Sequence, residues 1–312
     1  MSDSTRKYVQ LRSFSHPRYW PTWLGIGGIW LVAKLPFSIQ LWIGKLLGIL
    51  AFHFARSRRH VCETNLRLCF PELGEPELQQ LLRKTFESNG IGFIEIVIAW
   101  NGNRNRYQDL ANFHGLENLE AAAAQGRGVL LIGPHLTTFE MAGFLYSAVG
   151  ELNATYRAND KNPLFDAFMF NGRHRSYPGM FERKEIRGAM RCLRQGRVLW
   201  YAPDQDYGAE HSVFVPFFGN PAATITAGSR FAKFNDSPVI FFSHYRRQDN
   251  SGYDIYFSEV LTDYPSGNDE EDGRIINRLI EAAIRKQPDQ YLWLHKRFKT
   301  TPPGKTGNPY SA

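Results

Sequence analysis

One short apolar segment constrains the fold of this chain more than any other: residues 128–133 read Gly-Val-Leu-Leu-Ile-Gly and lead directly into Pro134 and His135. Four consecutive aliphatic residues between glycines predict a buried β-strand. Pro134 and the pair Thr137 and Thr138 predict that a helix begins just beyond, because proline disfavours helix before it and threonine can cap free N–H groups. A strand that turns into a helix is typical of an open α/β sheet, which carries its chemistry at that turn. We therefore expect His135 to face a crevice.

A carboxylate follows this histidine, since Glu140 lies five residues after His135. On a regular helix these positions point about 140° apart, so the side chains meet only if His135 precedes the helix. A carboxylate on one imidazole nitrogen would fix the tautomer and leave the other nitrogen as a base. The pair predicts hydroxyl activation for acyl transfer, although a His-x4-Glu spacing alone also arises by chance.

The rest of the chain alternates helical and extended patterns, which predicts an α/β fold with a mixed, largely parallel sheet flanked by helices. The predicted strands are residues 129–132, 152–156, 198–202, 239–245 and 253–257. The predicted helices are residues 78–100, 139–149, 162–174, 186–193 and 269–286.

Charged side chains follow several of these elements. Arg157 comes after one predicted strand and Asp204 after another, so both are expected at the same sheet edge as His135. Arg173 lies at the end of the intervening helix, where its cation could neutralise an oxyanion or a sugar phosphate. Each could also be an ordinary surface or turn residue, and it is their expected proximity to His135 that makes them candidates.

The excess positive charge lies in residues 1–60, which contain nine Lys and Arg against one acid, a net charge of +8 in a chain of +7. The same segment is the most apolar, with four tryptophans flanked by Arg18 and by the basic residues 56–59. These features predict a helix that dips into or spans a bilayer, with the basic cluster on its anionic cytoplasmic face. We therefore divide the chain into a membrane-anchoring segment, residues 1–60, and one α/β domain, residues 61–312. A pair of buried core helices is the alternative.

Several classes of function are disfavoured. The three cysteines include no Cys-x-x-Cys, so we expect neither a disulfide framework nor a metal site. The basic residues of the N-terminal segment are interleaved with bulky aliphatic residues, which argues against a nucleic acid partner. The chain contains no Gly-x-Ser-x-Gly, the motif of a serine hydrolase nucleophile.

Longer blocks of sequence carry a family resemblance. Beside the His-x4-Glu box they are residues 16–27, 65–72, 201–208 and 291–300. In this order, and over nearly the whole chain, they resemble the late acyltransferases of lipid A biosynthesis, and most of all the Kdo2-lipid IVA lauroyltransferase branch. The resemblance implies a glycerolipid acyltransferase-like fold with an N-terminal hydrophobic membrane-anchoring helix.

It also implies an activity: transfer of a lauroyl or similar medium-chain group from acyl carrier protein to a hydroxyl on a 3-hydroxyacyl chain of Kdo2-lipid IVA. The reaction would take place at the cytoplasmic face of the inner membrane, among its lipids, with no cofactor beyond the acyl carrier protein thioester. A myristoyl- or palmitoleoyl-type enzyme, a glycerolipid or lysophospholipid acyltransferase, and a membrane-docked lipid-binding protein with a structural histidine are the alternatives.

The family pattern also assigns roles to residues. It implies that His135 is the general base and Glu140 its orienting partner, and that Arg173 and Asp204 belong to the catalytic set. The expected substrate-binding residues are Arg157, Arg175 and Asp206.

Overall fold

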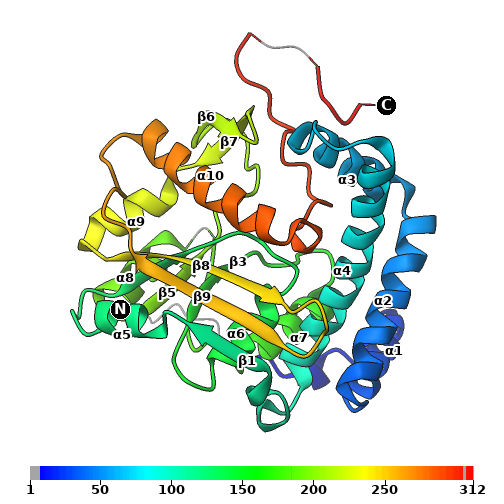
Figure 1. Cartoon of the computed structure of the whole chain (residues 1–312). Helices are drawn as coiled ribbons and strands as arrows, with labels where there is room; N and C mark the ends of the chain where they lie inside the picture. The colour runs from blue at the N-terminus through cyan, green and yellow to red at the C-terminus, as the bar shows by residue number, and fades with distance from the viewer. Residues whose placement is uncertain (1–7, 184, 305–306, 312) are drawn as a thin grey trace.

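A seven-stranded sheet forms the centre of the computed structural model, which describes residues 8–183, 185–304 and 307–311 (Figure 1). Its strand order is β1-β9-β8-β2-β5-β3-β4, and every neighbouring pair is parallel except β8 and β9. The strands are β1 (Ala111–His114), β2 (Val129–Ile132), β3 (Asn153–Tyr156), β4 (Met180–Glu182), β5 (Val198–Tyr201), β8 (Val239–Arg246) and β9 (Tyr253–Val260). The predicted mixed, largely parallel sheet is confirmed.

Helices cover this sheet on both faces. They are α1 (Trp20–Val32), α2 (Phe37–Phe54), α3 (Arg56–Cys69), α4 (Glu75–Asn101), α5 (Leu116–Ala123), α6 (Phe139–Tyr146), α7 (Pro163–His174), α8 (Ile186–Arg194), α9 (Ala227–Asn235) and α10 (Asp269–Lys286). A separate hairpin of β6 (Ser212–Phe217) and β7 (Asn220–Ile225) lies beside α10 in Figure 1. The sequence patterns missed this hairpin together with β1 and β4.

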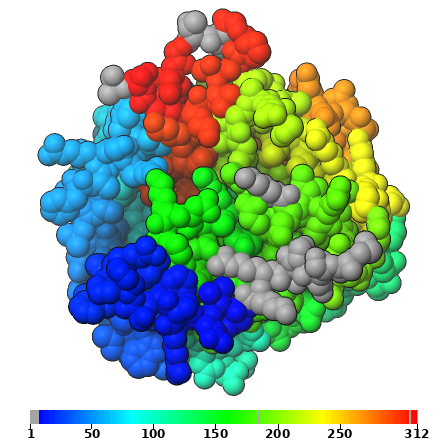
Figure 2. All heavy atoms as spheres, turned by 180° about the vertical axis from the view of Figure 1, so that it is seen from behind, coloured from blue at the N-terminus to red at the C-terminus, as the bar shows by residue number. Residues whose placement is uncertain are grey.

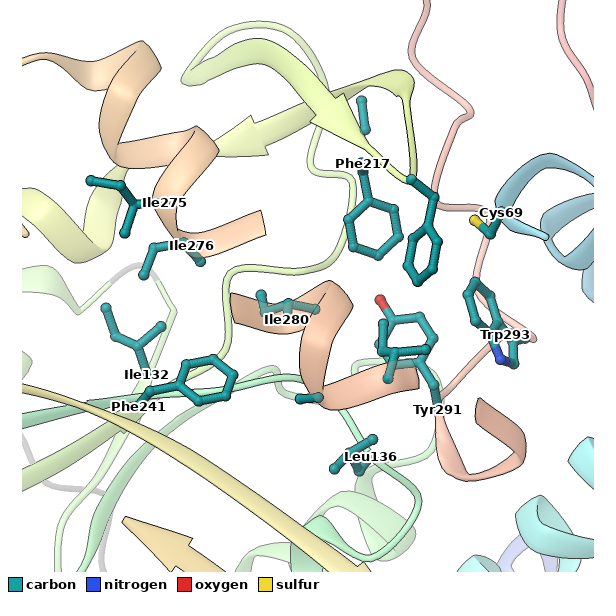
Figure 3. Close-up of a cluster of buried hydrophobic side chains, with 14 of the residues drawn as sticks. Cys69, Ile132, Leu136, Phe217, Phe241, Ile275, Ile276, Ile280, Tyr291 and Trp293 are labelled. Carbon is teal, nitrogen blue, oxygen red and sulfur yellow. The ribbon is translucent and has the colours of Figure 1, made fainter. Parts of the chain in front are cut away.

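Strand β2 shows why the central strands are apolar throughout. Leu130 and Ile132 enter the hydrophobic core beneath α10, whereas Val129 and Leu131 enter the core on the opposite side of the sheet. A strand buried on both faces must be continuously apolar, which accounts for the run of aliphatic residues before His135. Figure 3 shows the first of these cores, where side chains from the sheet meet those of α10 and of the hairpin.

Helices α2 and α4 cross at very short range because glycines face one another. A methyl group on Gly48 would lie 2.3 Å from the carbonyl oxygen of Phe86, and one on Gly90 would lie 2.2 Å from the carbonyl oxygen of Gly44. Two residues further along α4 and on its other side, a methyl group on Gly92 would lie 2.8 Å from Cβ of Thr137. Helix α4 therefore contacts α2 and the turn that carries His135 within three residues.

The outer surfaces of α1 and α2 form an apolar helix face, seen in part at the dark blue side of the molecule in Figure 2. Its exposed large side chains are Trp20, Leu24, Trp30 and Leu31 from α1, and Ile39, Trp42, Leu46, Leu47, Ile49, Leu50 and Phe54 from α2. By length and composition α2 could cross a membrane. The predicted N-terminal hydrophobic helix is therefore present, and so much exposed apolar surface disfavours the buried-pair alternative.

Helix α2 packs against α4, and residue 60 falls within α3. The division into a membrane-anchoring segment, residues 1–60, and one α/β domain, residues 61–312, stays a prediction. Residues 1–7 of that segment lie outside the described residues.

Candidate active site

His135 lies in the turn between β2 and α6, at the carboxyl edge of the parallel strands. Its side chain is 19% exposed. Its ring contacts the edge-on rings of Phe139 and Trp200, with centroids at 6.2 and 6.0 Å. One histidine at this edge is thus partly open to solvent and bordered by aromatic surface.

Asp204 binds His135 at two points. Its Oδ2 accepts a hydrogen bond from the His135 backbone N–H at 2.8 Å, and its Oδ1 lies 2.5 Å from Nδ1 of the ring. An ionised carboxylate can only accept, so Nδ1 carries a proton and Nε2 is the nitrogen left with a lone pair. Asp204 follows β5, which neighbours β2 in the sheet, and this adjacency brings the two residues together.

Electrostatics keeps Asp204 ionised. Its side chain is 1% exposed, and burial alone would raise the pKa of the carboxyl group. The neighbouring His135 and Arg297 outweigh that effect and hold the pKa below its ordinary value. A buried carboxylate that stays charged is well suited to stabilise a positive charge on the ring of His135.

The expected pairing of His135 with Glu140 is corrected by this geometry. Glu140 is the second residue of α6, and its side chain is 1% exposed. Its Oε1 accepts a hydrogen bond from Nε of Arg173 at 2.5 Å and also lies 2.5 Å from Nη2 of Arg173. Within the described part of the chain no hydrogen bond joins it to His135. The first turn of α6 directs Glu140 towards the end of α7, away from the ring nitrogens that Asp204 serves.

Arg173 is therefore the partner of Glu140. It lies in the last turn of α7, is 18% exposed, and its guanidinium lies 5.6 Å from the ring centre of Trp100. The four residues expected to be catalytic form two charged pairs, His135 with Asp204 and Glu140 with Arg173.

The residues expected to bind substrate are more scattered. Arg175 donates hydrogen bonds to the carbonyl oxygens of Trp100 at 2.8 Å and Gly102 at 2.9 Å, so it closes the carboxyl end of α4. Arg157 is exposed directly after β3, and its charge lies close enough to Tyr207 to oppose the rise that burial and Asp204 cause in the pKa of that tyrosine. Among the described residues Arg157 makes no such backbone hydrogen bonds, so of these two it is the better candidate to reach a ligand.

Asp206 is not available to a substrate, contrary to expectation. Its side chain is fully buried, and its carboxylate accepts hydrogen bonds from the backbone N–H of Thr300 at 2.8 Å and the hydroxyl of Thr300 at 2.7 Å. It also accepts from the N–H of Gly208 at 2.9 Å. These bonds make Asp206 a link between the loop after β5 and the C-terminal segment.

That C-terminal segment supplies residues that sequence reasoning left without a role. Leu292 donates its N–H to the carbonyl oxygen of His135 at 3.2 Å, and Tyr291 forms a bridge with Leu136, the two side chains being neighbours in Figure 3. His295 and Arg297 line the same narrow crevice as His135 and Asp204. The only sequence signal for these residues was the family resemblance of block 291–300.

Among the residues that the structure describes, no cluster of three or more His, Cys, Asp or Glu could hold a metal ion. The three cysteines are buried, and burial raises the pKa of each thiol, so none is an activated nucleophile.

Known proteins resemble this chain over almost its whole length. Residues 9–300 match the family model described as bacterial lipid A biosynthesis acyltransferase. The chain is 39% identical to the lipid A biosynthesis lauroyltransferase of Escherichia coli (strain K12), across 93% of this chain and 94% of that protein. It is 34% identical to the palmitoleoyltransferase of the same strain, over 95% and 96% of the two chains. The myristoyltransferase of that strain is 30% identical, over 96% and 93%.

Proposed function

The chain belongs to the bacterial lipid A biosynthesis acyltransferase family and is an acyltransferase, and on that premise we propose that it transfers a lauroyl or similar medium-chain group from acyl carrier protein to Kdo2-lipid IVA. The acceptor is a hydroxyl on one of the 3-hydroxyacyl chains. Support for the lauroyl group comes from the higher identity to the lauroyltransferase than to the palmitoleoyl and myristoyl enzymes. These other acyl groups remain the alternatives.

The observation that carries the mechanism is the bond between His135 and Asp204. With Nδ1 protonated, Nε2 of His135 takes the proton of the acceptor hydroxyl as the oxygen attacks the thioester carbonyl. The new C–O bond forms, the C–S bond breaks, and the carrier thiolate leaves with the electron pair. General base catalysis of this kind contributes about 10²- to 10⁴-fold in rate.

The second charged pair stabilises the negative charge that develops on the carbonyl oxygen. Glu140 holds the guanidinium of Arg173 in an ion pair, so this cation is available to the oxyanion and does not pair with Asp204 instead. The N–H of Phe139 is bonded to the carbonyl oxygen of Leu136, so the N–H groups of Glu140 and Met141 are the ones in the first turn of α6 that can add hydrogen bonds to the same oxyanion. In this scheme Glu140 acts on the transition state rather than on the tautomer of His135.

The apolar helix face supports a position at a membrane. Trp30 and Trp42 suit the interface between acyl chains and headgroups, and the basic residues Arg56, Arg58 and Arg59 at the start of α3 favour anionic lipid on the cytoplasmic side of the inner membrane. An acceptor with several acyl chains would meet the enzyme at this surface.

A product assay tests the proposal. Purified protein is incubated with lauroyl-, myristoyl- and palmitoleoyl-acyl carrier protein and with Kdo2-lipid IVA, and products are identified by mass spectrometry. We expect a penta-acylated product, formed fastest with the lauroyl donor, that is lost in His135→Ala. Acylation of a lysophospholipid in place of Kdo2-lipid IVA would refute the proposed acceptor.

A further inference from the structure

The loop that carries Asp204 has no regular secondary structure, since it runs from the end of β5 to the start of β6. The carboxylate of Asp204 makes two hydrogen bonds to His135. It can keep both only if the backbone of the loop that carries Asp204 is itself held in place. The C-terminal segment, residues 291–300, lies beside this loop, and the proposed mechanism does not use it.

This segment is rigidly held. The amide of Asn65, a fully buried residue of α3, donates to the carbonyl oxygens of Trp293 at 2.7 Å and His295 at 2.8 Å. The hydroxyl of Tyr310 donates in turn to Oδ1 of Asn65 at 2.5 Å. Buried amides with all their bonds made fix the backbone on which His295 stands.

His295 reaches from this backbone to the loop. Its Nε2 accepts a hydrogen bond from the backbone N–H of Asp206 at 3.3 Å. An acceptor at Nε2 must be unprotonated, so the proton of the neutral ring is on Nδ1. Burial favours this neutral form and lowers the pKa of His295 to about 4, although Asp204 acts in the opposite direction.

We propose that His295 is a positioning residue. By accepting a hydrogen bond from the N–H of Asp206, it fixes the loop after β5 and keeps Asp204 hydrogen-bonded to His135. The inference rests on the proposed role of His135 as the base. Thr300 donates two hydrogen bonds to the carboxylate of Asp206, while His295 accepts from its backbone N–H. The C-terminal segment thus holds both the backbone and the side chain of Asp206, two residues beyond Asp204, and we refer to this double attachment as the clamp.

Two substitutions of His295 separate this role from a merely structural one. His295→Gln places an amide oxygen where Nε2 stood and can still accept the N–H of Asp206, whereas the shorter His295→Asn cannot reach it. Lys296→Gln is the matched control, because Lys296 lies next in the segment and its ammonium nitrogen lies 5.5 Å from the ring centre of Tyr310.

The first readout does not depend on acyl transfer. The pKa of His135 is measured by NMR of the full chain in detergent with labelled histidine, and its signal is assigned with His135→Asn. A displaced Asp204 stabilises the protonated ring less, so we expect the pKa of His135 to fall by about half a unit or more in His295→Asn. It should be unchanged in His295→Gln and Lys296→Gln.

The second readout is the rate with acyl carrier protein thioester and Kdo2-lipid IVA. We expect kcat to fall about tenfold or more in His295→Asn with little change in KM, and to recover in His295→Gln. Equal losses in both variants with an unchanged pKa of His135 would overturn the positioning role, as would full activity in His295→Asn.

Two further outcomes are distinguished in advance. If the wild-type chain acylates nothing, the proposed function fails while the NMR titration still decides the positioning role. If His295→Asn does not fold, Thr300→Val removes one bond to Asp206 and should shift the pKa of His135 in the same direction by a smaller amount. No shift in Thr300→Val would then count against the clamp.

Discussion

Asp204 and His135 are 69 residues apart in the chain, yet the carboxylate of one holds both the backbone N–H and the ring Nδ1–H of the other. Two bonds from one carboxylate fix the position of the histidine as well as its tautomer. The base of the proposed mechanism is therefore positioned by the loop after β5.

Asp204→Asn should abolish most of this preparation. The amide can donate to Nδ1, which moves the ring proton to Nε2 and removes the base, so we expect kcat to fall by about 10²- to 10⁴-fold. Steady-state kinetics with circular dichroism as a check on folding will measure this. Glu140→Gln is the informative comparison: it should lower kcat without moving the pH at which activity appears, and a shifted pH profile in that variant would return Glu140 to the role of orienting partner.

His244 should make stability depend on pH. It is fully buried and bonded to the hydroxyl of Thr138, and burial lowers its pKa from 6.5 to about 3. Between these values the unfolded chain binds a proton that the folded chain excludes, so the contribution is complete above pH 6.5 and is lost as the pH falls. The free energy of unfolding should drop by about 2 kcal/mol between pH 6.5 and pH 5 through this residue.

Denaturant unfolding in mild detergent at the two pH values will test this, with His244→Asn as the comparison. Asparagine keeps a donor for Thr138 but does not titrate. Its stability should fall less between the two pH values than that of the wild type; an identical fall in both proteins would contradict the assignment.

The crossing of α2 and α4 should not tolerate a side chain. In Gly48→Ala the added methyl group meets the backbone of α4, so we expect a loss of about 1–3 kcal/mol in the free energy of unfolding. Gly27→Ala is the control, because Gly27 has open space around it in the middle of α1 and alanine is the better helix former there. Thermal unfolding should rank Gly27→Ala at or above the wild type and Gly48→Ala clearly below it.

Charges on the apolar helix face should release the protein from membranes. Burying a large apolar side chain is worth about 1.5–3 kcal/mol, so Trp30→Glu and Trp42→Glu should each weaken binding to vesicles containing anionic lipid by about tenfold or more. Ile186→Glu is the control, since Ile186 is equally exposed but stands on α8, across the molecule from α1 and α2 in Figure 1. Equal weakening by all three would mean that the apolar helix face is not the membrane contact.

The elements that sequence predicts best here are those whose pattern is local. Strand β2 and helix α10 have the predicted bounds because a continuous aliphatic run and a long amphipathic repeat identify them without tertiary information. Strand β4 has three residues, too few for a pattern. The hairpin of β6 and β7 turns at Phe218 and Gly219, both with positive φ, and only the glycine hinted at that turn.

The site shows the same division. That His135 and Asp204 share an edge follows from strand direction, and this was predictable. That they touch depends on β5 lying beside β2, with β3 one place further out, and strand order is decided by tertiary packing. The short spacing between His135 and Glu140 therefore suggested a partner that the fold assigns to Arg173.

Helix α4 touches α2 with Gly90 and the His135 turn with Gly92, so two packed helices, α2 and α4, lie between the outer apolar surface of α2 and the proposed base. A helix is about 10 Å across. In the proposed mechanism, the close packing of these two helices sets the distance between Nε2 of His135 and the acyl chains of the bilayer. We expect an acceptor chain to rise by about two helix diameters to be acylated, while its remaining chains stay among the lipids.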